Sequence, residues 1–211
     1  MPDQIIETVR LLAARGLNQG ASGNVSVRSG DGFIVTPSGV SAEALNVDQL
    51  VAMDMDGRWT GDWKPSSEWR FHRDIYAARP DAQAIVHCHS PAATALAVLG
   101  KPLPAFHYMV AIAGGSDVRC APYATFGTQD LSDYAVTALE GRRACLLAHH
   151  GMITLGSTLS QALDIAVEVE FLADIYLRLL PLGEPPVLPA AEMEVVLEKF
   201  KGYGANAQKR D

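Results

Sequence analysis

Several features that mark large classes of protein are missing from this sequence. It has only three cysteines among 211 residues, too few and too scattered for the disulfide framework of a small secreted domain. No apolar run reaches the roughly 18 residues of a membrane span, because Glu168, Glu170 and Asp174 interrupt the most apolar stretch. The segment from Met1 to Gln4 lacks the basic and apolar regions of a secretory signal. We therefore expect reduced thiols, a cytoplasmic location and no membrane partner.

Positive charge is also scarce. The chain has 17 Lys and Arg residues against 24 Asp and Glu, which gives a net charge of −7. A nucleic-acid-binding surface needs a basic stripe, and no segment supplies one, so we expect no nucleic-acid partner. An anionic small molecule is still compatible with this balance, because backbone N–H groups and a bound metal can hold a phosphate locally.

The rest of the composition is that of an ordinary globular protein. Hydrophobic residues make up 48% of the chain and charged residues 19%, which excludes a disordered chain, a coiled coil and a collagen-like fibre. A length of 211 residues fits one large domain better than two. We predict a single catalytic domain over residues 1–211, in which 201–211 form a C-terminal tail.

Hydrophobic periodicity and turn residues predict helices alternating with short strands. Strands occur both in hairpins and between helices, so we predict an α/β (α+β) fold with a largely antiparallel central sheet covered by helices on both faces. The predicted helices are 2–15, 66–78, 91–99, 129–139, 159–180 and 190–200. The predicted strands are 25–28, 33–36, 51–55, 58–60, 83–89, 144–149 and 152–155.

The segment His87-Cys88-His89 is the strongest local signal. Residues i and i+2 of a strand share a face, so the two imidazoles form a metal chelate or, in the plainer interpretation, two half-buried histidines with backbone partners. A third imidazole can come from His149 or His150, at the end of another apolar strand. Because adjacent strand residues face opposite ways, the pattern alone does not choose between these two. Three histidines with an open position are the layout of a catalytic zinc site.

Small and hydroxyl-bearing residues gather in three further places. Ser66-Ser67-Glu68 opens a predicted helix, which indicates either plain capping or an anion site at the helix N-terminus. The loops Ser22-Gly23-Asn24 and Thr36-Pro37-Ser38-Gly39 offer more backbone N–H groups. Together the three segments can form a phosphate cradle, and Glu68 would then stand between a phosphate site and a metal site.

Taken in order along the chain, these motifs resemble those of the class II aldolase/adducin family. The resemblance runs from near residue 20 to near residue 204, and its specificity comes from the set rather than from any single motif. The matching segments are 22–28, 36–39, 66–72, 87–89, 107–109, 120–128, 149–151 and 198–201.

The resemblance implies a metal-dependent enzyme with one divalent ion per subunit, for which we expect Zn²⁺. The implied ligands are His87, His89 and His150, with Glu68 as a further ligand in the resting state. Glu68 then moves away from the ion and serves as the catalytic acid and base.

The family also holds its substrate by a phosphate group. One position differs here: members that cleave fuculose phosphate carry Thr before Ser-Gly-Asn, whereas this chain has Ala21. The cradle therefore lacks one hydroxyl, and we expect adjusted phosphate binding rather than its loss. The implied phosphate-binding residues are Gly23, Asn24, Ser38, Gly39, Ser66 and Ser67.

Members of the family assemble as four-fold homotetramers and complete each site with aromatic residues from a neighbouring subunit. Tyr108, Phe126 and Tyr203 match those positions. A homotetramer is therefore expected for this chain.

The implied reaction is reversible cleavage of a ketose 1-phosphate, such as L-fuculose 1-phosphate, to dihydroxyacetone phosphate and a lactaldehyde-like aldehyde. A divalent metal can stabilise the enediolate that this cleavage leaves. Glu68 would move the proton at the enediolate carbon, and the Tyr108 phenol would exchange the proton on the aldehyde oxygen. A Schiff-base route needs a buried lysine, whereas Lys64 and Lys101 lie beside prolines in loop-like segments.

Related members use the same metal set for other reactions, and these stay open as alternatives: dehydration or cleavage of methylthioribulose 1-phosphate, decarboxylation of oxo-tetronate phosphates and 4-epimerisation of ribulose 5-phosphate. A binding role like that of the adducin head is disfavoured, since the adducin head lacks the catalytic set that this chain carries. His72, four residues after Glu68 on the same helical face, either orients Glu68 or packs in the core.

Overall fold

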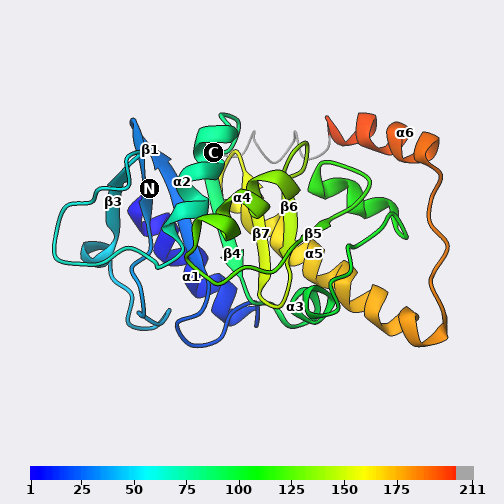
Figure 1. Ribbon diagram of the computed structural model, residues 1–211, viewed down its shortest axis with the longest axis horizontal. Coiled ribbons are helices and arrows are strands. Elements are labelled where there is room, and N and C mark those ends of the chain that lie inside the picture. The colour runs from blue at the N-terminus through cyan, green and yellow to red at the C-terminus, as the bar shows by residue number, and fades with distance from the viewer. Residues whose placement is uncertain (203–211) are drawn as a thin grey trace.

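In the computed structural model, which describes residues 1–202, seven strands form one sheet. The spatial order is β3-β2-β1-β4-β7-β6-β5 (Figure 1), and every neighbouring pair is antiparallel except β5 and β6. The predicted α/β (α+β) domain with a largely antiparallel central sheet is thereby confirmed. The strands are β1 (Asn24–Ser29), β2 (Gly32–Val35), β3 (Val51–Asp54), β4 (Ala84–Cys88), β5 (Arg119–Ala121), β6 (Ala144–Leu147) and β7 (Gly151–Gly156).

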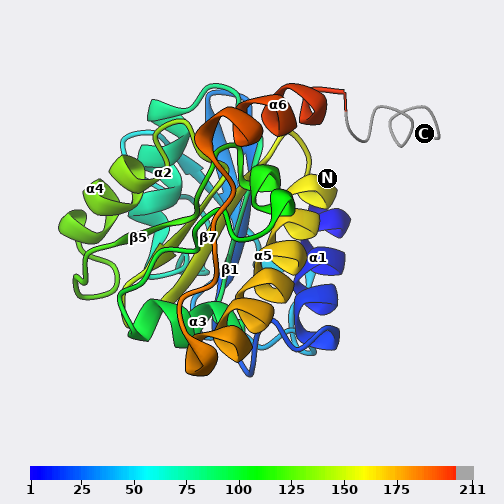
Figure 2. The same ribbon diagram turned by 90° about the vertical axis from the view of Figure 1, so that its right-hand side faces the viewer.

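Helices cover both faces of this sheet. Figure 2 shows α2 and α4 on one face and α1 and α5 on the other, while α6 lies across one end against the 3₁₀ helix η2 (Tyr108–Ala113). The helices are α1 (Pro2–Ala14), α2 (Trp69–Ala78), α3 (Pro91–Val98), α4 (Gln129–Ala138), α5 (Leu159–Leu179) and α6 (Ala190–Phe200).

Alternation along the central strands builds a separate core on each face. On β4, Val86 and Cys88 point into the core under α1, α3 and α5, whereas Ile85 points into the core under α2 and α4. All five β4 residues are buried, as expected for a central strand that is covered on both sides. His87 follows Ile85 by two residues, so it lies on the α2 side of the sheet.

Near the histidines, one helix begins later and one strand ends earlier than the sequence predicts. The helix predicted from residue 66 begins at Trp69, because residues 66–68 form a turn in which the Trp69 N–H donates to the Ser66 carbonyl. The strand predicted to reach residue 149 ends at Leu147, since His149 adopts a left-handed φ of 57°. Both changes lie beside the histidines.

Other differences lie away from the histidines. The segment 58–60 forms only an isolated bridge between Met53 and Trp59 rather than a full strand. The short strand β5 and the 3₁₀ helix η2 are absent from the prediction, because neither carries enough residues to show a period. Of the predicted tail 201–211, residues 203–211 lie outside the described part of the chain.

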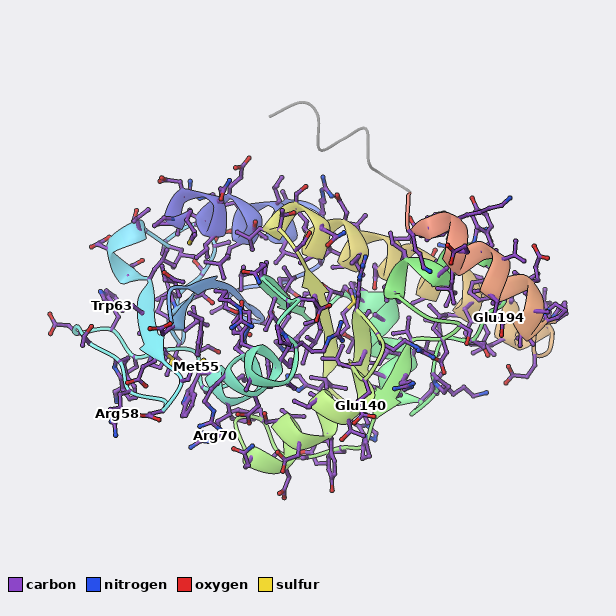
Figure 3. The ribbon with its side chains drawn as sticks, turned by 90° about the horizontal axis from the view of Figure 1, so that it is seen from above. Met55, Arg58, Trp63, Arg70, Glu140 and Glu194 are labelled. Carbon is purple, nitrogen blue, oxygen red and sulfur yellow. The ribbon has the colours of Figure 1, made fainter. Side chains whose placement is uncertain are left out.

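Seen from above, the sheet again lies between the two helical layers (Figure 3). The loop after β3, with Met55, Arg58 and Trp63, forms one end of the molecule, and α6 with Glu194 forms the opposite end. Within residues 1–202 we find no helix long and apolar enough to cross a membrane.

Candidate active site

Three histidines from two parts of the sheet converge at one point. His87 lies on β4, His89 follows that strand directly, and His150 precedes β7. Their ring centroids are 4.8 to 4.9 Å apart in all three pairs. One nitrogen of each ring lies within 4.8 Å of the others, so the group can hold a metal ion.

The hydrogen bonding of His87 fixes which of its nitrogens faces the cluster. Its Nδ1 lies 2.9 Å from the carbonyl oxygen of Met152, on the neighbouring strand β7. A carbonyl only accepts, so Nδ1 carries a proton and donates it, and Nε2 is the nitrogen that faces the cluster. His87 Nε2 lies 3.0 Å from His89 Nε2. This arrangement, in which the outer nitrogen donates to a backbone carbonyl, is typical of metal-binding histidines.

Glu68 closes the fourth side of the cluster. Its Oε2 lies 3.2 Å from His87 Nε2, and its Oε1 lies 3.2 Å from His150 Nε2. Oε1 is buried and has no hydrogen-bond donor within residues 1–202. Burial raises the pKa of this carboxyl, but the neighbouring His87 and His150 and a hydrogen bond from Asn24 outweigh it and lower the pKa to about 2. Glu68 is therefore an anion at neutral pH.

The imidazoles of His89 and His150 are neutral at the same pH. Burial and the neighbouring His87 lower the pKa of both His89 and His150 to about 4, against an opposing effect of Glu68. The lone pairs of His89 and His150 and the Glu68 carboxylate thus face one point, which is costly unless a cation binds between them. Nitrogen atoms bound tetrahedrally to zinc at 2.0–2.1 Å lie about 3.3 Å apart, close to the shortest separations here. The donor set fits a divalent metal.

The turn before β7 explains how His150 joins the cluster. The left-handed φ of 57° at His149 is unusual for a residue other than glycine. Because of this turn, the strand alternation assumed for residues 149 and 150 does not hold, and both side chains line the same pocket. His149 lies edge-on to Tyr123 with ring centroids 5.9 Å apart.

A pocket of about 340 Å³ opens beside the cluster, within the size range of small-molecule sites. It brings Glu68, His89 and His150 together with the predicted phosphate loops, whereas His87 is fully buried behind them. The predicted phosphate residues that line it are Gly23, Asn24, Ser38, Gly39, Ser66 and Ser67.

Fewer backbone N–H groups of the predicted phosphate cradle are free to bind an anion than the sequence predicts. The Ser38 N–H donates to the Lys64 carbonyl and the Ser66 N–H to the Thr36 carbonyl, so neither is free. Within residues 1–202, the N–H groups of Gly23, Gly39 and Ser67 have no partner. Gly39 and Ser67 are exposed, and Gly23 is half-buried. These amides and the nearby Ser hydroxyls can donate to an anion.

The predicted aromatic residues fall in different places. Phe126 lines the pocket of its own chain and is 64% exposed. Tyr108 begins η2, is 50% exposed and lies outside this pocket. Tyr203 lies outside the described residues.

Sequence reasoning gave no role to several residues that shape the pocket. Tyr123 and Ala124 line it, and Asn18 accepts a hydrogen bond from the His89 N–H through its side-chain oxygen. His149, one of the two candidates for the third imidazole, lines the pocket as well. Tyr123 and Ala124 lie in a segment that matches the family pattern, which was the only signal for them. Nothing in the local sequence marks Asn18.

Comparisons with known proteins agree with this geometry. The chain is 59% identical to the 5-methylthioribulose-1-phosphate/5-deoxyribulose-1-phosphate aldolase of Rhodospirillum rubrum, over 97% of this chain and 92% of that protein. It is 50% identical to the L-fuculose phosphate aldolase of Escherichia coli K12, over 95% and 94% of the two chains. A solved structure of L-fuculose 1-phosphate aldolase superposes with a TM-score of 0.92 at 44% identity, covering 95% of each chain. Residues 3–177 match the Class II Aldolase and Adducin N-terminal domain family, and the chain belongs to that family.

Proposed function

We propose that this class II aldolase cleaves a ketose 1-phosphate reversibly, between C3 and C4, to dihydroxyacetone phosphate and an aldehyde. One divalent ion per subunit, Zn²⁺, would be held by His87, His89 and His150. The observation that carries this proposal is the convergence of these imidazoles with the Glu68 carboxylate beside a pocket lined by the phosphate loops.

The proposed cleavage uses the bound ion, the Glu68 carboxylate and the Tyr108 phenol. The bound ion would stabilise negative charge on the substrate oxygens by several kcal/mol. In the synthetic direction, Glu68 takes the proton from the hydroxyl-bearing carbon of dihydroxyacetone phosphate, and that carbon then attacks the aldehyde. The Tyr108 phenol of a neighbouring subunit donates a proton to the aldehyde oxygen. Cleavage reverses these steps.

The phosphate would bind to the free N–H groups of Gly23, Gly39 and Ser67. The hydroxyls of Ser38 and Ser66 would complete the cradle. Ser67 lies just before α2, so the positive end of that helix dipole adds to the attraction. The side chain of Asn24 faces Glu68 rather than the loops, with Nδ2 donating to Oε2 at 2.9 Å. We therefore assign Asn24 to the carboxylate more than to the phosphate.

The aldehyde half distinguishes three candidate substrates. L-fuculose 1-phosphate would release lactaldehyde, whereas 5-deoxyribulose 1-phosphate would release acetaldehyde and its 5-methylthio analogue methylthioacetaldehyde. The relative at 59% identity is named for the two deoxypentulose phosphates and the one at 50% for fuculose phosphate. The apolar side chains of Ala124 and Phe126 on the pocket wall suit either an acetaldehyde or a methylthio end.

The experiment is a side-by-side measurement of kcat/KM for the three ketose 1-phosphates, with coupled detection of dihydroxyacetone phosphate. At least one should be cleaved, and the corresponding free ketose should react far more slowly because it cannot use the cradle. Equal kcat/KM for a phosphorylated and a free sugar would refute the phosphate assignment. No dihydroxyacetone phosphate from any of the three would refute the proposed function.

We further propose a homotetramer, in which Tyr108 and Tyr203 reach the site of a neighbouring subunit, whereas Phe126, also expected to do so, lines the pocket of its own chain. The exposed position of Tyr108, outside its own pocket, supports this for one of the two residues. The cytoplasmic location stays a prediction from the cysteines.

A further inference from the structure

A row of buried polar side chains runs from the site into the interior, between α2 and β1. His72 and Tyr76 lie four residues apart on one face of α2, and Glu68 lies four residues before His72, directly before the helix begins. Asn24 and Ser26 follow at an interval of two on β1 and face that helix. All five are buried, the most exposed being Glu68 at 6%.

These side chains form one continuous chain of hydrogen bonds. Asn24 Nδ2 donates to Glu68 Oε2 at 2.9 Å, and Asn24 Oδ1 lies 2.5 Å from His72 Nε2. The other ring nitrogen, His72 Nδ1, lies 2.7 Å from Ser26 Oγ. Ser26 Oγ in turn lies 2.8 Å from the Tyr76 hydroxyl.

The direction of every bond follows from the Glu68 end. An ionised carboxylate only accepts, so the Asn24 amide must present its NH₂ group to Glu68 and its oxygen to His72. That oxygen also only accepts, so His72 Nε2 must carry the ring proton. His72 has one proton to give when it is neutral, and its Nδ1 is then an acceptor.

Ser26 and Tyr76, at the end of the hydrogen-bond chain away from Glu68, have donors and acceptors that fit this direction. Ser26 donates to His72 Nδ1, and Tyr76 donates to the Ser26 oxygen. Complete burial lowers the pKa of His72 to about 3, with the neighbouring His87 acting in the same direction and Glu68 against it. The ring is therefore neutral across the working range of an enzyme, as the pattern requires.

We infer that His72 is a positioning residue, which holds the Asn24 amide in the one orientation that donates to Glu68 and so fixes the carboxylate beside the histidine cluster. The opposite tautomer would turn the Asn24 oxygen toward the carboxylate, where two acceptors repel. The consequence for catalysis rests on the proposed function of Glu68, whereas the tautomer does not. A merely packed His72 would have no required tautomer.

The first test compares two substitutions at this position. His72→Leu removes both nitrogens, and because small misplacements of a reacting group cost about 10²-fold, kcat should fall about 100-fold. KM and bound metal should stay near wild type. His72→Gln retains an N–H donor near the position of Nε2 and should recover about tenfold of the loss. An unchanged kcat in His72→Leu, or no difference between the Leu and Gln variants, would overturn the inference.

Ser132→Ala is a matched control. Ser132 is fully buried, and its hydroxyl donates to Asp74 at 2.7 Å, outside the chain that leads to Glu68. Its loss removes a buried hydrogen bond as the His72 variants do, and kcat should stay near wild type. A fall equal to that of His72→Leu would mean that any buried polar deletion slows the enzyme, which contradicts a specific role for His72.

The second test needs neither substrate nor variant activity. In protein labelled with ¹⁵N in the histidine rings, the His72 signals are those lost in His72→Gln. They should report a protonated Nε2 and an unprotonated Nδ1. A protonated Nδ1, alone or with Nε2, would overturn the inference. Because no turnover is measured, this result stands apart from the substrate panel, whose failure would refute the proposed function instead.

Discussion

The proposed function gives Glu68 two roles, that of a metal ligand and that of a proton carrier. Its carboxylate lies 3.2 Å from two imidazole nitrogens, in the position of a metal ligand, yet the proposed reaction also requires it to carry a proton. The single hydrogen bond from Asn24 to Oε2 leaves Oε1 without a donor in the described residues. One oxygen is thus held in place while the other is available for chemistry.

Glu68→Gln separates these roles at the residue scale. Glutamine keeps the size of the side chain but removes the base, and a positioned general base contributes roughly 10²–10⁴-fold to rate. We expect cleavage to fall by about that factor, while the three imidazoles still retain the metal. Exchange of the carbon-bound proton of dihydroxyacetone phosphate with deuterium, followed by NMR, should slow as well. Near-normal exchange would assign the base to another residue.

The buried histidines predict how stability depends on pH. The pKa of His72 is about 3 in the folded protein and about 6.5 in an unfolded chain. Below pH 6.5 the unfolded chain binds the proton first, so the stability present above pH 6.5 is lost as the pH falls toward 3. The slope from one such group approaches about 1.4 kcal/mol per pH unit. His89 and His150, whose pKa values are about 4, act in the same direction.

Urea denaturation of metal-free protein at pH 7.5, 6.0 and 5.0 measures this slope. The free energy of unfolding should fall with pH, and it should fall less steeply in His72→Gln, which has no ring to protonate. Identical slopes for wild type and variant would contradict the burial of a neutral His72.

The local sequence pattern predicted some residues of the site and left others open. The interval of two in His87-Cys88-His89 was sufficient to place two imidazoles together, because strand geometry determines it. The choice of His150 over His149 came from the family resemblance, since it depends on one left-handed backbone angle that no local pattern announces. The role of His72 was left open because it depends on Ser26 and Asn24, more than forty residues away.

The loop between α1 and β1 packs tightly against β4, the strand that carries His87. Gly23 has a φ of 73°, and a Cβ there would lie 2.6 Å from the carbonyl oxygen of His87 and would also meet the Asn18 side chain. The loop therefore sets the position of His87 directly, besides lining the phosphate cradle.

Gly23→Ala should destabilise the protein and weaken metal binding together. Left-handed strain costs about 1–2 kcal/mol, and overpacking against a backbone carbonyl adds about 1–3 kcal/mol. Gly30→Ala is the matched control, because its φ is 55° but no atom lies within 4 Å of the added Cβ. Zinc titration of both variants should show reduced affinity only for Gly23→Ala. Equal affinity in the two would mean that the loop does not position the ligand strand.

Elements with a strong period were predicted well, and those without one were not. α6 occupies the predicted residues, and α1 and α5 differ from prediction by one residue, because their apolar faces repeat over three turns or more. The start of α2 was misplaced by three residues, since Ser66 resembles an N-cap but accepts from the Glu68 N–H within a turn. The strand β5 was not predicted, because it has only three residues and its position depends on its parallel pairing with β6.

In the whole molecule, the proposed reaction requires more than one chain. Tyr108 is half exposed and lies outside the pocket of its own subunit, so its proposed proton transfer needs a neighbour. A closed homotetramer supplies each site with the same contribution from the next subunit.

Mixing two inactive variants tests this sharing. If Glu68 and Tyr108 of one site come from different chains, tetramers co-assembled from Glu68→Gln and Tyr108→Phe subunits contain sites with both native residues. Random assembly makes about one site in four intact, so activity should return to about a quarter of wild type. Recovery no greater than the sum of the separate variants would place both residues in one chain or remove Tyr108 from the reaction.

The central claim is that the three converging histidines hold a metal on which cleavage depends. Elemental analysis of wild type and His87→Ala, paired with release of dihydroxyacetone phosphate from the best of the three ketose 1-phosphates, tests it most directly. We expect one divalent ion per wild-type subunit, and loss of both the ion and the product in the variant. Full metal occupancy with undiminished cleavage in His87→Ala would contradict it.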